Sequence, residues 1–359
     1  MLTKRKKVLI GFLNGIIPVV LAFALGSVFI SVAGHNPLQV YGLIVKEAFL
    51  DKKGFINTLA YGTPIIITAL AACIAYNANV YNFGTEGQLY CGAFLAAFLG
   101  FTLSGLPHIV HVTICLLGGI AGGMAYALIP ALLKSLLRIN EVVTTIMLNS
   151  VAIIVTTYLT NGPFNAHVGY SATDPVAESA QFSRLYPGAR LTTSFFMMLI
   201  LVVAVHIVLS KTKLGYEIRA LGSNSEFSDA MGMRVYKKYI LLFLISGGIS
   251  GLAGASEIMG VNYRFTPSFS TNPGLGWDGV QIALLARNNP ILSLVVGIIY
   301  GGFKYGGVVL QSQLGLSNDV INIIQSSMIL FLAVRYVDEK TGFLRKLFKG
   351  NAKKQEAVK

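Results

Sequence analysis

Long apolar segments recur along almost the whole chain, and they constrain its fold more than any other feature of the sequence. A helix needs roughly 20 apolar residues to cross a hydrocarbon layer about 30 Å thick. Hydrophobic residues make up 54% of the chain and charged residues only 12%, whereas a soluble domain carries roughly 25% charged residues. We therefore predict an all-α polytopic membrane protein.

The apolar segments predict about ten transmembrane helices. The segment 276–287 is short for a full crossing, so we describe it as a half-helix or re-entrant segment. The predicted segments are 8–33, 56–77, 87–104, 107–133, 141–160, 192–210, 238–260, 276–287, 290–311 and 319–337.

The distribution of Lys and Arg predicts the orientation, because basic residues near the ends of spans are retained in the cytoplasm. With both termini inside, most of the 28 Lys and Arg residues lie in cytoplasmic segments, chiefly 1–7, 211–238 and 338–359. We therefore predict a multi-pass inner-membrane protein with both ends in the cytoplasm. The net charge of +13 then reflects topology and contact with anionic lipid, not nucleic-acid binding.

Two short patterns occur twice and in the same order. "GTEGQ" at 84–88 recurs loosely as "GWDGVQ" at 276–281, and "NEVV" at 140–143 recurs as "NDVI" at 318–321. Each pattern has the same place in a block of four spans, which predicts an inverted repeat of spans 2–5 and 7–10. Such repeats are typical of transporters, where interrupted helices line the transport pathway.

The glycine-flanked acids of the first pattern, Glu86 and Asp278, are the strongest functional candidates. Glu86 is the only charged residue between Lys53 and Lys134, and a carboxylate at membrane depth normally faces a bundle interior or a water-filled cavity. Each acid either contacts the transported molecule or accepts hydrogen bonds from backbone N–H groups freed where a helix is interrupted. Lys304 is a candidate ionic partner for Asp278 or Glu257.

The second pattern is a common way to start a helix. An Asn caps free backbone N–H groups, and the following acid faces the positive end of the helix dipole. The predicted capping residues are Asn140, Glu141, Asn318 and Asp319; contact of these pairs with the substrate is the alternative.

The cytoplasmic segment 211–238 predicts a short amphipathic helix, because Phe227, Ala230 and Met231 are spaced at i, i+3 and i+4. Such a segment either lies on the lipid headgroups or docks a cytoplasmic partner. Opposite it, the external loop 161–192 carries Asp174, Glu178, Arg184 and Arg190, which either receive an external protein or are simply solvated.

The stretch "GYEIRALGSNSEFSDAMGM" resembles the coupling segment in the permease subunits of bacterial ABC importers of the branched-chain amino acid, ribose and simple-sugar class. In that family an Arg-Ala-x-Gly-x-Asn stretch leads into a short helix that ends near a Gly; the family often has Pro after the Asn, where this chain has Ser225. The residues that the resemblance assigns to ATPase coupling are Gly215, Arg219, Ala220, Gly222, Asn224, Phe227, Ala230 and Gly232.

Three further stretches, "NFGTEGQ", "NEVVTTIMLN" and "GWDGVQIALLARNNP", resemble the nucleoside-type branch of that family, which handles purine nucleosides or simple sugars. The resemblance implies a single transmembrane permease domain over 1–359, a second permease subunit, cytoplasmic ABC ATPases and an external substrate-binding lipoprotein. The chain contains no G-x-x-x-x-G-K-[ST] phosphate loop, so the partner ATPases would use the ATP. We expect the chain itself to bind no cofactor or metal and to have no enzyme activity.

The sequence therefore predicts a permease subunit for a nucleoside. A permease for ribose or another simple sugar is the first alternative, and an ion-coupled secondary transporter is the second. Amide side chains suit a nucleoside because they both donate and accept hydrogen bonds, and aromatic faces stack on bases. The sequence leaves open which nucleoside or sugar is carried and whether the second permease is a copy or a paralogue. The predicted pathway residues are Asn82, Glu86, Gln88, Asn149, Trp277, Asp278, Gln281 and Asn288.

Overall fold

The computed structural model describes residues 20–271, 274–315, 322–324, 326 and 327. These residues divide into two compact units. The larger unit runs from Ala48 to Tyr305, and the smaller takes the described residues up to Glu47 and from Gly306 onward. The candidate functional residues that the structure describes lie in the larger unit.

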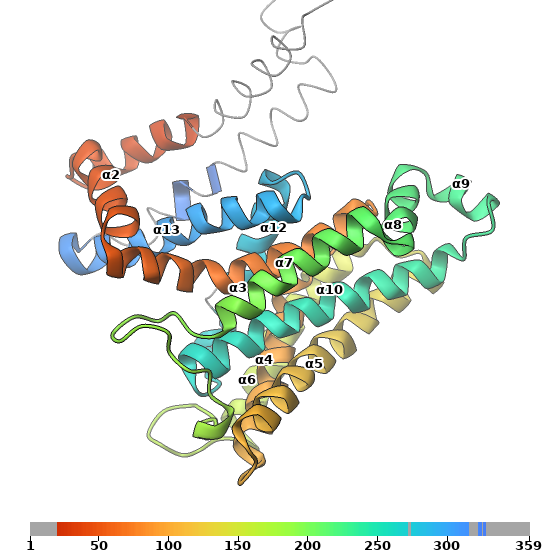
Figure 1. Cartoon of the computed structure of the whole chain (residues 1–359), viewed down its shortest axis with the longest axis horizontal. Coiled ribbons are helices and arrows are strands. Elements are labelled where there is room, and N and C mark those ends of the chain that lie inside the picture. Colours follow the sequence, from red (N-terminus) through yellow and green to blue (C-terminus); the bar gives the residue numbers. More distant parts are fainter. Residues whose placement is uncertain (1–19, 272–273, 316–321, 325, 328–359) are drawn as a thin grey trace, which may run out of the picture. The chain divides into compact units, whose positions relative to one another are not determined.

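The described residues form an all-α structure, in which extended pairing is limited to one bridge between Arg184 and Thr192. Figure 1 shows the helices in their chain order. Their bounds are α2 Pro37–Val45, η1 Lys46–Leu50, α3 Lys52–Asn77, α4 Thr85–Thr102, α5 His108–Leu137, α6 Glu141–Asn161, η2 Glu178–Ala180, α7 Ser194–Lys211, α8 Lys213–Ser223, α9 Ser225–Ala230, α10 Val235–Glu257, η3 Ile258–Asn262, α11 Pro267–Thr271, α12 Leu275–Leu285 and α13 Pro290–Leu314.

Six of the described helices are long and apolar enough to cross a membrane: α3, α5, α6, α7, α10 extended through η3, and α13. A seventh crossing is possible where two shorter helices, Val20–Val32 and Pro37–Leu50, meet at a bend of 116°. The polytopic all-α architecture is thus confirmed. The count of about ten spans and the inverted repeat stay predictions, and most of the predicted span 319–337 lies outside the described residues.

Helix α2 was not anticipated from hydropathy, although its start is legible in the sequence. Asn36 accepts a hydrogen bond from the Leu38 N–H at 3.0 Å, and Pro37 occupies the first turn. Asn as the cap followed directly by Pro is a favoured helix start, because Pro has no N–H to leave unsatisfied there.

Helices α4, α5 and α10 pack together through glycines, and they lie side by side in Figure 1. A Cβ atom added to Gly251 of α10 would lie 2.1 Å from the carbonyl oxygen of Gly119 of α5, and one added to Gly123 would lie 2.1 Å from that of Gly247. Small residues let helix backbones approach closely where lipid supplies no hydrophobic driving force. This packing fixes α4, whose first turn begins the candidate site.

Helix α12 has only 11 residues, in keeping with the half-helix expected from the segment 276–287. It packs against α3 and α4. Its Ile282 shares an apolar cluster with Ile65 of α3 and Tyr300 of α13. Gly274 precedes it with φ of 60°, a left-handed conformation that glycine adopts without steric cost. The turn therefore directs the first N–H groups of α12 toward α4.

Candidate functional site

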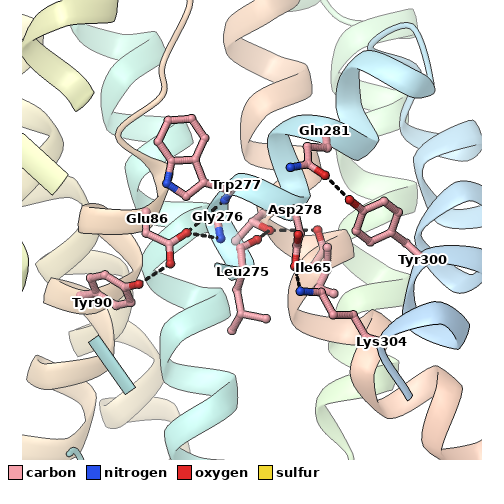
Figure 2. A network of polar contacts seen from close by, with 11 residues as sticks. Ile65, Glu86, Tyr90, Leu275, Gly276, Trp277, Asp278, Gln281, Tyr300 and Lys304 are labelled. Carbon is pink, nitrogen blue, oxygen red and sulfur yellow. Dashed lines mark hydrogen bonds and ion pairs between the residues drawn. The ribbon is translucent and has the colours of Figure 1, made fainter. Parts of the chain in front are cut away.

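The first turns of α4 and α12 meet at the carboxylate of Glu86, as Figure 2 shows. Its Oε2 atom accepts hydrogen bonds from the backbone N–H groups of Gly276 at 2.7 Å and Trp277 at 3.0 Å. Its Oε1 atom accepts a hydrogen bond from the Tyr90 hydroxyl one turn along α4. Glu86 therefore caps α12, whose own N-cap residue, Gly274, has no side chain to do so.

The two helices approach each other so closely that only glycine fits at position 276. A Cβ atom there would lie 2.5 Å from the Glu86 nitrogen and 2.7 Å from its Oε2 atom. A Cβ atom at Gly279 would lie 2.2 Å from the hydroxyl of Thr68, and this hydroxyl donates to the Leu275 carbonyl at 2.8 Å. The glycines that flank the acids thus bring α12 against both α3 and α4.

The chain between α3 and α4 is held by buried amide side chains. Asn82 donates to Gln88 Oε1 at 3.0 Å and to Ser246 Oγ of α10 at 2.9 Å, and it accepts from the Gly84 N–H at 3.0 Å. Asn149 of α6 accepts from the Gly87 N–H and donates to the Phe83 carbonyl, both at 2.9 Å. In this conformation the predicted pathway residues Asn82, Gln88 and Asn149 are buried and bond to the protein itself.

Asp278 lies in the first turn of α12 and forms an ion pair with Lys304 of α13, with 2.9 Å between Oδ2 and Nζ (Figure 2). The side chains are 8% and 23% exposed, so the pair is largely removed from solvent. Of the two partners that the sequence left open for Lys304, the structure shows Asp278. One turn further along α12, Gln281 accepts a hydrogen bond from the Tyr300 hydroxyl.

Trp277 and Asn288, the remaining predicted pathway residues, each have a group that is available for contact. Trp277 is 37% exposed, and its ring lies 5.9 Å from that of Phe83 at a tilt of 33°. Tyr76 extends this aromatic row, with its ring 6.0 Å from Phe83 and 5.4 Å from Tyr81. Asn288 follows α12, and its buried Oδ1 atom has no hydrogen-bond partner among the described residues.

A cavity of about 380 Å³ opens beside the junction. It is bounded by α3, the end of α10 with η3, α11, the start of α12, α13, and the end of the loop 161–192. Apolar side chains such as Pro64, Ile65 and Phe269 form part of its wall. Hydrogen-bonding and charged groups form the rest. The polar lining residues are Tyr61, Arg190, Glu257, Asn262, Thr266, Ser268 and Lys304.

Residues 54–333 match the family described as the branched-chain amino acid transport system, permease component. The chain belongs to this family. It is therefore a transport permease and not an enzyme. The match begins in the first turn of α3 and extends through α13, so it includes the α4–α12 junction.

Three relatives are similar over nearly the whole permease. The glucose ABC transporter permease protein TsgB13 of Haloferax volcanii is 30% identical over 88% of this chain and 86% of its own length. The guanosine ABC transporter permease protein NupP of Bacillus subtilis is 29% identical over 89% and 92%. The nucleoside ABC transporter permease protein NupB of Lactococcus lactis is 26% identical over 94% and 93%. No solved structure matches the chain.

The segment between α7 and α10 of the permease contains two short helices, α8 and α9, where the sequence predicted one. They meet at Asn224, whose extended backbone ends α8 and whose side chain accepts from the Phe227 N–H at 2.9 Å to start α9. The spacing of apolar residues indicated only α9, because the glycines within α8 are typical of loops and concealed that helix. Gly232 follows α9 with φ of 85°, a conformation suited to a residue without Cβ.

The Arg-Ala-x-Gly-x-Asn stretch has structural roles within α8 of the permease. Arg219 donates to the Leu209 carbonyl near the end of α7. Cβ atoms at Gly215 and Gly222 would lie 2.2 Å from the Val208 carbonyl oxygen and 2.3 Å from that of Asn77. These contacts hold α8 against α7 and α3. Ala220 is half-buried, whereas Ala230, Phe227 (64% exposed) and Met231 (73% exposed) project from the α9 segment.

The start of α6 in the permease carries the predicted capping pair. Asn140 accepts a hydrogen bond from the Val142 N–H at 2.9 Å, and Glu141 forms an ion pair with Lys134 of α5 at 2.7 Å. This ion pair joins α5 to α6 across their short connection. The corresponding pair, Asn318 and Asp319, lies outside the described residues.

The loop 161–192 is anchored to the helix bundle by side-chain contacts. His108 and His111 of α5 bond the Ser179 carbonyl and hydroxyl at 2.9 and 2.8 Å. Arg190 donates to the Tyr61 hydroxyl of α3 at 2.6 Å. Asp174 and Glu178, in contrast, are exposed. The sequence singled out Arg190 for a surface role and missed its place in the cavity wall.

Proposed function

We propose that the chain is the permease subunit of an ATP-driven importer that carries a nucleoside across the plasma membrane. The similarity to two permeases named for guanosine and for nucleosides, over 89% and 94% of this chain, carries the proposal. Both matches extend through the α4–α12 junction and the cavity beside it.

The geometry supports a neutral cargo with a flat ring and hydroxyl groups. The cavity beside the junction combines apolar walls with a carboxylate, an amide and hydroxyl groups, and the half-exposed Trp277 ends a row of aromatic rings. A nucleoside base can stack on an aromatic face, and its ribose can donate and accept hydrogen bonds. In this proposal Trp277 and Asn288 meet the cargo, while Asn82, Gln88 and Asn149 support the interrupted backbone.

The proposed importer has four kinds of partner or neighbour: a second permease subunit, cytoplasmic ATPases, an external substrate-binding protein, and lipid. Bacillus subtilis and Lactococcus lactis each have a second permease that also matches this chain, at 26% and 23% identity, which supports a paralogous pair. The exposed apolar side chains of the α9 segment, Phe227 and Met231, would dock the ATPase. Both termini would then be cytoplasmic.

A simple-sugar permease is the second candidate, because the glucose permease relative is 30% identical over 88% of the chain. The cavity suits a hexose through the same hydrogen-bonding groups.

Uptake by the assembled importer tests the proposal. The two permeases, the ATPase and the binding protein are reconstituted in proteoliposomes, and labelled guanosine, adenosine, uridine and glucose are supplied with ATP. We expect ATP-dependent uptake of at least one nucleoside, with weak competition from ribose or glucose. Stronger competition by a sugar than by every nucleoside would overturn the nucleoside assignment. Transport by the purified chain alone, without ATP, would overturn the importer assignment.

A further inference from the structure

One acidic residue of the cavity has no part in the α4–α12 junction. Glu257 is the last residue of α10 and lines the cavity. Directly after it the backbone widens into the π-helix η3, and Tyr263 ends this turn with φ of 56°. Single π-turns occur frequently at functional sites. The wider turn begins directly after Glu257, at the end of the regular helix α10.

The carboxylate of Glu257 has no hydrogen bond or ion pair within the part of the chain that the structure describes. The two cationic groups of the cavity are occupied elsewhere. Lys304 pairs with Asp278 at 2.9 Å. Arg190 donates to the Tyr61 hydroxyl at 2.6 Å and stacks 5.2 Å from the centre of the same ring, and it acts on Glu257 only as a nearby charge. Glu257 thus presents two acceptor oxygens to the cavity.

A carboxylate in a membrane-embedded cavity is costly unless hydrogen-bond donors satisfy it. The neighbouring hydroxyl and amide groups, on Thr266, Ser268 and Asn262, make no hydrogen bond to it. Donors must therefore come from the contents of the cavity. A vicinal pair of hydroxyl groups matches this requirement, because each hydroxyl can donate to one oxygen of an acceptor-only carboxylate.

We propose that Glu257 binds the transported molecule by accepting hydrogen bonds from two adjacent hydroxyl groups of its sugar. The inference rests on the proposed function and deepens it: the diol belongs to the ribose of a nucleoside or to a hexose. The cavity volume of about 380 Å³ lies within the range of small-molecule sites, roughly 300–1,000 Å³. Apolar walls at Pro64, Ile65 and Phe269 leave room for the less polar part of the cargo.

The test compares hydroxylated and deoxygenated cargo in the complete importer, with the same binding protein throughout. Proteoliposomes carrying wild type, Glu257→Gln or Glu257→Asp take up labelled guanosine or 2′-deoxyguanosine at subsaturating concentrations. Glu47→Gln is the matched control, because Glu47 is a half-exposed carboxylate outside the cavity. Stimulation of ATP hydrolysis by the unloaded binding protein checks that each complex is assembled.

We expect Glu257→Gln to lower guanosine uptake about tenfold, the effect of losing a hydrogen bond to a charged group. The decisive readout is the ratio of guanosine to 2′-deoxyguanosine uptake, which should fall toward one in Glu257→Gln, recover in part in Glu257→Asp, and stay at the wild-type value in Glu47→Gln. Equal losses for both nucleosides would mean a structural role and would overturn the inference. A change confined to discrimination between guanosine and inosine would overturn it too, because the base and not the diol would then be the ligand.

The two proposals fail separately. If the wild-type importer takes up glucose but no nucleoside, the proposed nucleoside function is wrong, and the inference about Glu257 still stands. The ratio of glucose to 2-deoxyglucose uptake would then test Glu257 in the same way, and a ratio unchanged by Glu257→Gln would overturn the inference for either cargo.

Discussion

Two substitutions of Glu86, to Gln and to Ala, distinguish the contribution of its hydrogen bonds to stability from that of its negative charge. Both N–H groups of α12 bond to the same oxygen, Oε2, whereas the Tyr90 hydroxyl bonds to Oε1. In Glu86→Gln, the amide oxygen can therefore keep both N–H bonds while the amide nitrogen donates to the Tyr90 oxygen. In Glu86→Ala, the N–H groups of Gly276 and Trp277 and the hydroxyl of Tyr90 lose their acceptor.

The magnitudes follow from these contacts. Each buried donor left unsatisfied costs about 1–3 kcal/mol, and Glu86 accepts from three donors, so Glu86→Ala should destabilise the permease by about 3–9 kcal/mol. Glu86→Gln loses only the interaction of a negative charge with helix N-termini, up to about 2 kcal/mol. The alanine variant should thus be clearly the less stable of the two.

The assay uses the single tryptophan of the chain. That residue is Trp277, whose backbone N–H bonds to Glu86, so its emission reports directly on α12. The purified permease is unfolded by SDS in mixed micelles while this emission is followed. Glu178→Ala serves as the control because its carboxylate is exposed. Wild-type stability in Glu86→Ala, or equal losses in the two Glu86 variants, would refute the capping argument.

Three further outcomes are expected. Gly251→Ala should lower the free energy of unfolding by about 1–3 kcal/mol or more, because the added carbon would lie 2.1 Å from the Gly119 oxygen. Gly42→Ala is the control, because a Cβ atom there meets nothing within 4 Å. Equal unfolding midpoints for the two variants would contradict this prediction. Lys304→Met should lower the free energy of unfolding by about 3–5 kcal/mol by leaving Asp278 unpaired, and adding Asp278→Asn should restore most of that stability. If the destabilising effects of the two substitutions simply add in the double mutant, the pairing is contradicted. Phe227→Ala should leave the unfolding midpoint unchanged but lower ATP-driven uptake about tenfold, and unaltered uptake would exclude Phe227 from ATPase docking.

The sequence predicted the helices well wherever an apolar run coincided with a helix. The segments 56–77 and 141–160 correspond to α3 and α6 with only a few residues of difference at the ends. Helix α8 was missed because its packing glycines, Gly215 and Gly222, are indistinguishable from loop glycines until the neighbouring carbonyl groups are known. Packing partners, unlike hydropathy, are not encoded locally.

The candidate site was predictable as a set of residues but not as a set of contacts. A carboxylate at membrane depth marked Glu86 and Asp278, and the i, i+4 spacing of Tyr90 from Glu86 was available as a further signal. The bonds from Glu86 to Gly276 and Trp277 join positions about 190 residues apart, and no local pattern indicates them. From the sequence, Glu257 was a candidate partner for Lys304 and, with Glu86 and Asp278, a candidate proton or cation site of an ion-coupled transporter. Its role as an unpaired acceptor emerges only once Lys304 and Arg190 are seen to be engaged elsewhere.

The contact between positions 86 and 276 also bears on how this gene can change over generations. Because a Cβ atom at 276 would lie 2.5 Å from the backbone nitrogen of residue 86, an atom that every residue at that position carries, glycine is needed at 276 whichever residue occupies position 86. Position 86 is constrained through its side chain, which must accept from the N–H groups of Gly276 and Trp277. Recombination that exchanges one half of this permease with that of a distant paralogue would separate positions 86 and 276, and the hybrid would have to match both sides of the junction at once.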